Sequence, residues 1–166
     1  MSEQLESAKP LFVFGTLMDT DVLQLVSGME LSALTRQPAL ARGFKRRRVQ
    51  SESFPILIAS NADSVSGLLV YGLNAMALQR TQFFEGDEYT LQPIQVDSLP
   101  GSHASMAGTG VIEAVFFADN LVYQFDDHDW SIEHWQAQYK EVFLSRIAHY
   151  MGFFGSLGIA DADQHW

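Results

Sequence analysis

The chain's first apolar stretch is LFVFGTLMD, residues 11–19, and the way its strand ends is unusual. Its four apolar residues, 11–14, predict a buried strand, and Gly15-Thr16 ends this run. An ordinary turn would more often use Asn-Gly, Asp-Gly or Pro-Gly at this place. A glycine at a strand end also lets a ligand approach bare backbone N–H groups. The stretch therefore predicts either a plain strand end or a binding loop, and the rest of the chain has to distinguish the two.

The composition is that of one globular domain with a sizeable core, since 47% of the 166 residues are hydrophobic and 18% are charged. The chain has no run of about 18 apolar residues and no signal-peptide pattern at its start, so we expect no membrane segment and a cytoplasmic location. The net charge of −10 argues against a nucleic-acid partner, because phosphates would be repelled. The absence of cysteine excludes disulfides, thiolate metal sites and thiol nucleophiles.

The hydrophobic pattern predicts more strands than helices. We expect strands over 11–14, 38–49, 54–60, 64–73, 87–96 and 111–118, with a bend at Gly43 and an interruption at Gly67. We expect helices over 18–28, 74–83 and 130–151, capped by Asp19 or Thr20, by Asn74, and by Asp129 or Ser131. Because strands and helices do not alternate regularly, the fold class is α+β with a mixed or mostly antiparallel sheet, for which closure into a barrel is one solution.

The chain divides into three parts by pattern. Residues 1–10 are polar and predict a loose N-terminal arm, and 11–152 predict a single domain that contains a glycine-rich loop over 98–110. Residues 153–166 show no usable periodicity, so the structure of this C-terminal tail stays open.

Glu85 is the first candidate for chemistry. The segment QFFEGDEY, residues 82–89, places it at a helix end, after two phenylalanines and before Gly86. The negative end of the helix dipole and the apolar neighbours both disfavour a charged carboxylate. Both effects would raise the pKa of Glu85 towards values that suit proton transfer at neutral pH. The alternative is that Glu85 points into water beside a glycine that ends the helix.

The basic run KRRR, residues 45–48, stands out in an acidic chain. On a strand, Arg46 and Arg48 share one face, and Lys45 and Arg47 share the other. The first interpretation is a solvated edge strand that its charges protect from aggregation. The alternative is an inward arginine that binds a substrate carboxylate.

The segment DDHDW, residues 126–130, places His128 among aspartates. It lacks a second histidine at i+4 and the carboxylate spacing of a calcium loop. We therefore expect a solvated loop that leads into a helix cap, and no metal site.

Segments of this chain resemble, in the same order, motifs of the γ-glutamylcyclotransferase-like superfamily. FVFGTL (12–17) resembles its Tyr-Gly-[Ser/Thr]-Leu signature, LARGFKRRRV with FPILI (40–58) its Gly-[Phe/Tyr]…Tyr-Pro-x-[Ile/Val] stretch, VSGLLVYGL (65–73) its Val-x-Gly-x-[Leu/Val]-Tyr-x-Leu strand, and FFEGDEY (83–89) its Phe-Glu-Gly-x-x-Tyr block. DWSIEHWQAQYKEVFL (129–144) is similar to the Trp-x-[Ile/Phe]-Glu-x-Trp segment of the plant avirulence-induced branch. The resemblance spans 11–150 and implies a mixed, mostly antiparallel β-barrel flanked by helices, with a pocket at one end.

The resemblance also implies a site and a reaction. Glu85 would be the general acid/base, and the substrate-binding positions would be Phe14, Gly15, Thr16, Leu17 and Tyr89. The expected partner is a small molecule whose γ-glutamyl head group is held by backbone N–H groups of the loop. Its free α-amine attacks its own γ-carbonyl, which forms 5-oxoproline and releases an amine without a metal or a cofactor.

Departures from the family pattern keep other functions open. Phe14 stands where the family has tyrosine, Phe116 aligns with another pocket tyrosine, and no arginine or lysine follows Tyr89 closely. These changes imply a less polar pocket. We favour a cyclotransferase that acts on a γ-glutamyl amine or related small amide. The alternatives are a binding module with the same pocket but no turnover, and a small-amide hydrolase. The substrate and the oligomeric state stay open.

Overall fold

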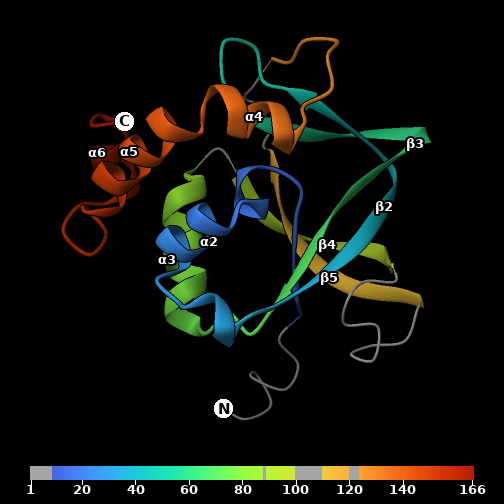
Figure 1. The fold of residues 1–166 in the computed structure, drawn as a ribbon, viewed down its shortest axis with the longest axis horizontal. Helices are drawn as coiled ribbons and strands as arrows, with labels where there is room; N and C mark the ends of the chain where they lie inside the picture. The colour runs from blue at the N-terminus through green and yellow to red at the C-terminus, as the bar shows by residue number, and fades with distance from the viewer. Residues whose placement is uncertain (1–8, 88, 100–109, 120–123) are drawn as a thin grey trace.

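The strands close into a barrel. The structure, a computed structural model, describes residues 9–87, 89–99, 110–119 and 124–166, and these form five strands in the order β1-β3-β2-β4-β5 (Figure 1). The strands are β1 Leu11–Val13, β2 Thr35–Arg48, β3 Pro55–Tyr71, β4 Tyr89–Ser98 and β5 Gly110–Asp119. Neighbouring strands are antiparallel, except that β1 runs parallel to β5. The predicted α+β class and the mixed, mostly antiparallel barrel are confirmed.

The two longest strands form one hairpin. β2 pairs with β3 from Arg48↔Pro55 to Thr35↔Tyr71, with a register shift beside Gly43, where the bend was predicted. The prediction of separate strands over 54–60 and 64–73 is wrong, because the long strand β2 pairs with both halves of β3. Gly67 does not interrupt β3; a side-chain carbon there would lie 2.4 Å from the Val13 carbonyl, so this glycine allows β1 to approach.

Two hydrophobic clusters lie on opposite faces of the sheet. Phe12 and Phe14 join a cluster whose members come only from the strands and their ends, and which therefore fills the barrel. Leu11 and Val13 belong to the second cluster, which includes residues of the helices. This division follows from the alternation of side chains along a strand.

The helices gather against one side and one end of the barrel (Figure 1). They are α2 Thr20–Ser27, α3 Ala75–Glu85, α4 Ile132–Gln138, α5 Lys140–Met151 and α6 Ile159–Asp163, with short 3-10 turns η1 Thr16–Met18 and η2 Leu31–Ala33. The Asp19, Asn74 and Ser131 side chains cap α2, α3 and α4, as the sequence predicted. No helix in the described part of the chain has the length and apolar character to cross a membrane.

The predicted continuous helix over 130–151 is wrong. Tyr139, with φ −124°, interrupts it between α4 and α5. The apolar spacing continues across the break, so the pattern does not reveal it. The bend lets α4 contact η1 while α5 packs against α2.

The C-terminal tail folds back onto the helices. It contains α6, and the Trp166 ring makes edge contacts with Phe143 at 5.5 Å and Tyr150 at 5.6 Å between centroids. Most of the predicted arm 1–10 and loop 98–110 lies outside the described residues. The division into arm, domain and tail stays a prediction.

Candidate functional site

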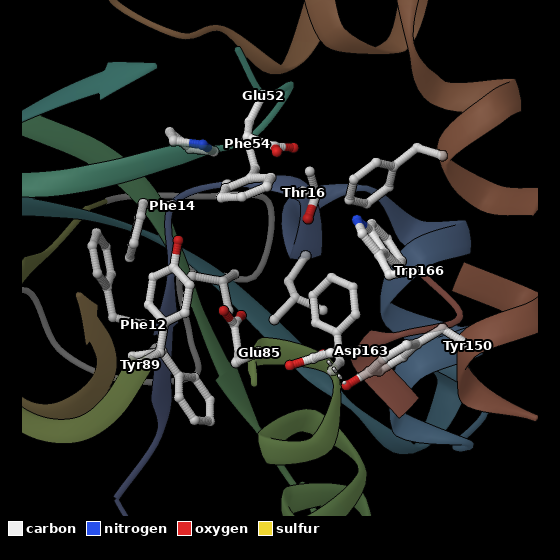
Figure 2. Close-up of a pocket in the computed structure, with 17 residues that line it drawn as sticks. Phe12, Phe14, Thr16, Glu52, Phe54, Glu85, Tyr89, Tyr150, Asp163 and Trp166 are labelled. Atoms are coloured by element: carbon white, nitrogen blue, oxygen red, sulfur yellow. Dashed lines mark hydrogen bonds between the residues drawn. The ribbon is translucent and has the colours of Figure 1, made fainter. Parts of the chain in front are cut away.

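A cavity of about 300 Å³ lies where the end of β1 meets the helices (Figure 2). Its walls include every site residue predicted from the sequence: Phe14, Gly15, Thr16, Leu17, Glu85 and Tyr89. Residues 14–17 follow β1 and run into the first turn of η1, Glu85 is the last residue of α3, and Tyr89 is the first residue of β4. The fold therefore brings together residues that are about 70 positions apart in sequence; their roles in binding and catalysis stay predictions.

The loop leads directly into a tight helical turn. Met18 and Asp19 donate backbone hydrogen bonds to the carbonyls of Gly15 and Thr16, both at 3.0 Å. The N–H groups that precede Met18 therefore have no acceptor inside this turn. Pro55, which also lines the cavity, packs against Gly15, where an added side-chain carbon would lie 3.1 Å from two ring carbons. Glycine at this position thus permits the close packing of Pro55 against the loop at the cavity wall.

Glu85 has the electrostatic character that the sequence predicted. Burial raises the pKa of its carboxyl to about 8. Within the described part of the chain, no charged or hydrogen-bonding partner contributes to this shift. The predicted direction is confirmed, and desolvation causes it. At neutral pH the carboxyl is mostly protonated, but it can lose and regain its proton at little cost.

The C-terminal half of the chain adds wall residues that the sequence did not predict. Tyr150 of α5, Asp163 of α6 and Trp166 all line the cavity (Figure 2). The Tyr150 hydroxyl lies 2.8 Å from the Phe83 carbonyl oxygen and 3.2 Å from Asp163 Oδ1, so its single hydrogen is shared between these two acceptors. Burial raises the pKa of Asp163 although the Tyr150 hydrogen bond opposes the shift. The segment 159–163 has no apolar periodicity, so no signal in it pointed to a pocket.

The two phenylalanines that depart from the family pattern lie differently. Phe14 and Phe116 are both buried in the barrel cluster and meet edge to face, with ring centroids 6.5 Å apart. Only Phe14 also lines the cavity, and the neighbour of Phe116, Phe117, lines it instead. The expectation that Phe116 is a pocket residue is therefore wrong. Alternation along β5 places Phe116 and Phe117 on opposite faces, and Phe117 is the one that borders the cavity.

The basic run is not a uniformly solvated face. The Arg46 side chain is only 13% exposed, and its guanidinium donates to the Phe14 carbonyl at 3.0 Å. Arg48 pairs with Asp126 at 3.2 Å. Neither arginine lines the cavity. The solvated interpretation is wrong for Arg46, which points inward but contacts the protein's own backbone.

The aspartate-rich segment before α4 behaves as a loop. His128 is exposed and lies 3.6 Å from Asp126, and Ser131 caps the helix that follows. Among the described residues, no group of three histidine, aspartate or glutamate side chains is placed to hold a metal ion.

Comparison with known proteins places the chain in a family. A family model described as Gamma-glutamyl cyclotransferase, AIG2-like, matches residues 11–136, a span that contains the loop, Glu85 and every described strand. The chain belongs to this AIG2-like family. The matched span ends before α5, so the cavity residues Tyr150, Asp163 and Trp166 lie beyond it.

Curated AIG2-like relatives come from Arabidopsis thaliana. AIG2-like protein D is 28% identical over 142 residues, which cover 81% of this chain and 83% of that protein. Protein AIG2 C is 22% identical over 134 residues, which cover 81% and 76%.

Solved structures share the fold. The solution structure of an Arabidopsis thaliana protein aligns with a TM-score of 0.58 at 18% identity and covers 90% of this chain and 94% of that one. A structure named gamma-glutamyl cyclotransferase aligns with a TM-score of 0.53 at 14% identity and covers 95% and 85%.

Proposed function

We propose that this AIG2-like protein is a cyclotransferase that converts a γ-glutamyl amine or related small amide to 5-oxoproline and a free amine. The observation that carries the proposal is that the loop 14–17 and the Glu85 carboxyl, with its raised pKa, line one cavity. The cavity is of a size that takes a small ligand. Membership of the AIG2-like family supports the same reaction class.

In the proposed mechanism, the loop N–H groups bind oxygens of the head group and orient it for ring closure. The Glu85 carboxylate takes a proton from the substrate ammonium, and the freed amine attacks the γ-carbonyl carbon. The attacking nitrogen, now in the ring, gives up its second proton to solvent. The bond from the γ-carbon to the leaving nitrogen then breaks, and Glu85 returns its proton to this nitrogen, so that a lactam and a free amine result. A base with a pKa near the working pH suits both transfers, and the intramolecular attack needs only orientation.

A binding module without turnover is the second candidate. The observation that favours it is Phe14, whose ring occupies the cavity wall where the family has a tyrosine hydroxyl. Without this hydroxyl, the cavity wall offers fewer polar contacts to a transition state than a wall with tyrosine at this position would.

Substitution of Glu85 tests the proposal. Glu85→Gln keeps the side-chain size but cannot accept the ammonium proton, so turnover should fall by about a hundredfold or more. The melting temperature should stay equal or rise slightly, because a desolvated acid is removed. Glu133→Gln, on an exposed site of α4, is the matched control and should change neither.

The assay uses a panel of γ-glutamyl amides and measures 5-oxoproline. Free glutamate instead of 5-oxoproline would indicate a hydrolase, and saturable binding without any product would indicate the binding module. Wild-type turnover by Glu85→Gln, on a substrate that the wild type accepts, would refute the mechanism.

A further inference from the structure

Arg46 is an inward arginine that the proposed mechanism does not use. Its Nη1 donates to the Phe14 carbonyl at 3.0 Å and to the Ser66 carbonyl at 3.3 Å. Its Nε lies 3.3 Å from Asp129, and its guanidinium lies 5.6 Å from the centroid of the Trp130 ring. The guanidinium thus joins the end of β1 to β3 and to the loop before α4. These contacts together hold the Arg46 guanidinium in one position.

The Phe14 carbonyl is chemically linked to the cavity loop. It belongs to the same peptide unit as the Gly15 N–H, and the described chain has no cis peptide bond. In a planar trans peptide, the carbonyl and the N–H point in opposite directions. Arg46 binds the carbonyl from outside the cavity, whereas Phe14 and Gly15 both border the cavity. The N–H of Gly15 is therefore directed away from Arg46.

We propose that Arg46 is a positioning residue that, by holding the Phe14 carbonyl, turns the Gly15 N–H towards the cavity to bind an oxygen of the ligand's head group. Because glycine has no side chain, the peptide unit between Phe14 and Gly15 can rotate more freely than it could before any other residue. A hydrogen bond to its carbonyl therefore fixes the orientation of this peptide unit. A hydrogen bond from a guanidinium is charge-assisted and is stronger than one between neutral groups. The inference rests on the proposed function only in taking the loop as the head-group site.

The test compares Arg46→Met with Arg42→Met. Methionine keeps an unbranched stem against Trp130 but cannot donate a hydrogen bond. Arg42 lies on the same strand, its side chain is 73% exposed, and it pairs with Asp97. Two quantities are measured on each protein: the affinity for 5-oxoproline and the NMR resonance of the Gly15 amide, with and without 5-oxoproline.

The expected result is specific to Arg46. Arg46→Met should shift the Gly15 amide resonance of the free protein and weaken 5-oxoproline binding by about tenfold or more, the scale of a lost hydrogen bond to a charged group. Arg42→Met should change neither quantity. Arg46→Lys retains the charge and one donor, so it should bind with intermediate affinity. This variant also serves as the test if Arg46→Met fails to fold.

Several results would overturn the inference. These are unchanged affinity in the folded Arg46 variants, an unmoved Gly15 resonance, or a wild-type protein whose Gly15 amide does not respond to 5-oxoproline. None of these readouts needs turnover. A wild type that binds 5-oxoproline through Gly15 but forms no product would refute the proposed function and leave the inference standing.

Discussion

At the scale of single residues, the position of Glu85 explains why the pKa of its carboxyl is raised. It is the last residue of α3, and Gly86 after it adopts φ +85°, a conformation that favours glycine. Glu85 is half-buried and lines the cavity, so its carboxyl is partly withdrawn from water. Desolvation without a compensating partner favours the neutral acid.

The first prediction concerns catalysis as a function of pH. If Glu85 acts as the base, kcat/KM should rise with pH as the carboxylate forms, with an inflection near the Glu85 pKa of about 8. A pH–rate profile with a γ-glutamyl amide as substrate measures this rise of kcat/KM with pH. A profile that is already flat between pH 6 and 9 would contradict the role of Glu85 as the base.

The second prediction concerns stability as a function of pH. The pKa of Glu85 is raised from 4.5 to about 8, so the folded state binds the proton more tightly than the unfolded state. The contribution of Glu85 to stability is therefore full below pH 4.5, declines as the pH rises, and is lost above about 8. Urea unfolding at several pH values should show a shallower decline for Glu85→Gln than for the wild type. Parallel curves for the two proteins would contradict the raised pKa.

At the scale of elements, Asp19 connects the cavity turn to three helices. Its Oδ1 accepts from the backbone N–H groups of Asp21 and Val22 at the start of α2. Its Oδ2 accepts from Gln136 of α4 at 2.8 Å and pairs with Lys140 of α5 at 2.9 Å. Burial opposes ionisation, but these hydrogen bonds together hold the pKa of Asp19 below its usual value. The break at Tyr139 gives α4 and α5 separate directions, and both helices reach this one carboxylate.

The third prediction follows from these contacts. Asp19→Ala removes a helix cap and the buried partner of Lys140. The free energy of unfolding should therefore fall by about 2–3 kcal/mol. Asp21→Ala is the control, because Asp21 also pairs with Lys140 but its side chain is 63% exposed, against 1% for Asp19. Its loss should cost less than about 1 kcal/mol. Urea unfolding compares the two, and equal losses would contradict the structural role of Asp19.

At the scale of the whole molecule, the short strand β1 closes the barrel and carries the cavity loop. It pairs with β3 on one side and, in parallel, with β5 on the other. Gly67 of β3 makes this pairing possible, because a side-chain carbon there would meet the Phe12 ring at 2.8 Å as well as the Val13 carbonyl. Barrel closure and site formation thus depend on the same contact.

The fourth prediction is that Gly67→Ala displaces β1. The added methyl group has no free space, so the loss of stability should exceed about 2 kcal/mol, and 5-oxoproline binding should weaken with it. Ser66→Ala, at an exposed site one residue earlier, should change both by little. A stable Gly67→Ala variant with normal binding would show that β1 tolerates displacement.

Features that depend on near neighbours in the chain could be predicted from the amino-acid sequence. Strand alternation, the Asn74 and Ser131 caps and the bend at Gly43 leave local patterns, and the motifs around Gly15 and Glu85 placed the candidate site. Three features emerged from the folded structure instead: β3 is continuous, the last long helix breaks at Tyr139, and Arg46 points inward. The folded structure also shows that Tyr150, Asp163 and Trp166 complete the cavity. These features arise from contacts between distant residues, such as Arg46 with Phe14 across 32 positions and Tyr150 with Phe83 across 67. Such contacts leave no periodic trace in the segments that make them, because the partner, rather than the local pattern, determines where each side chain lies.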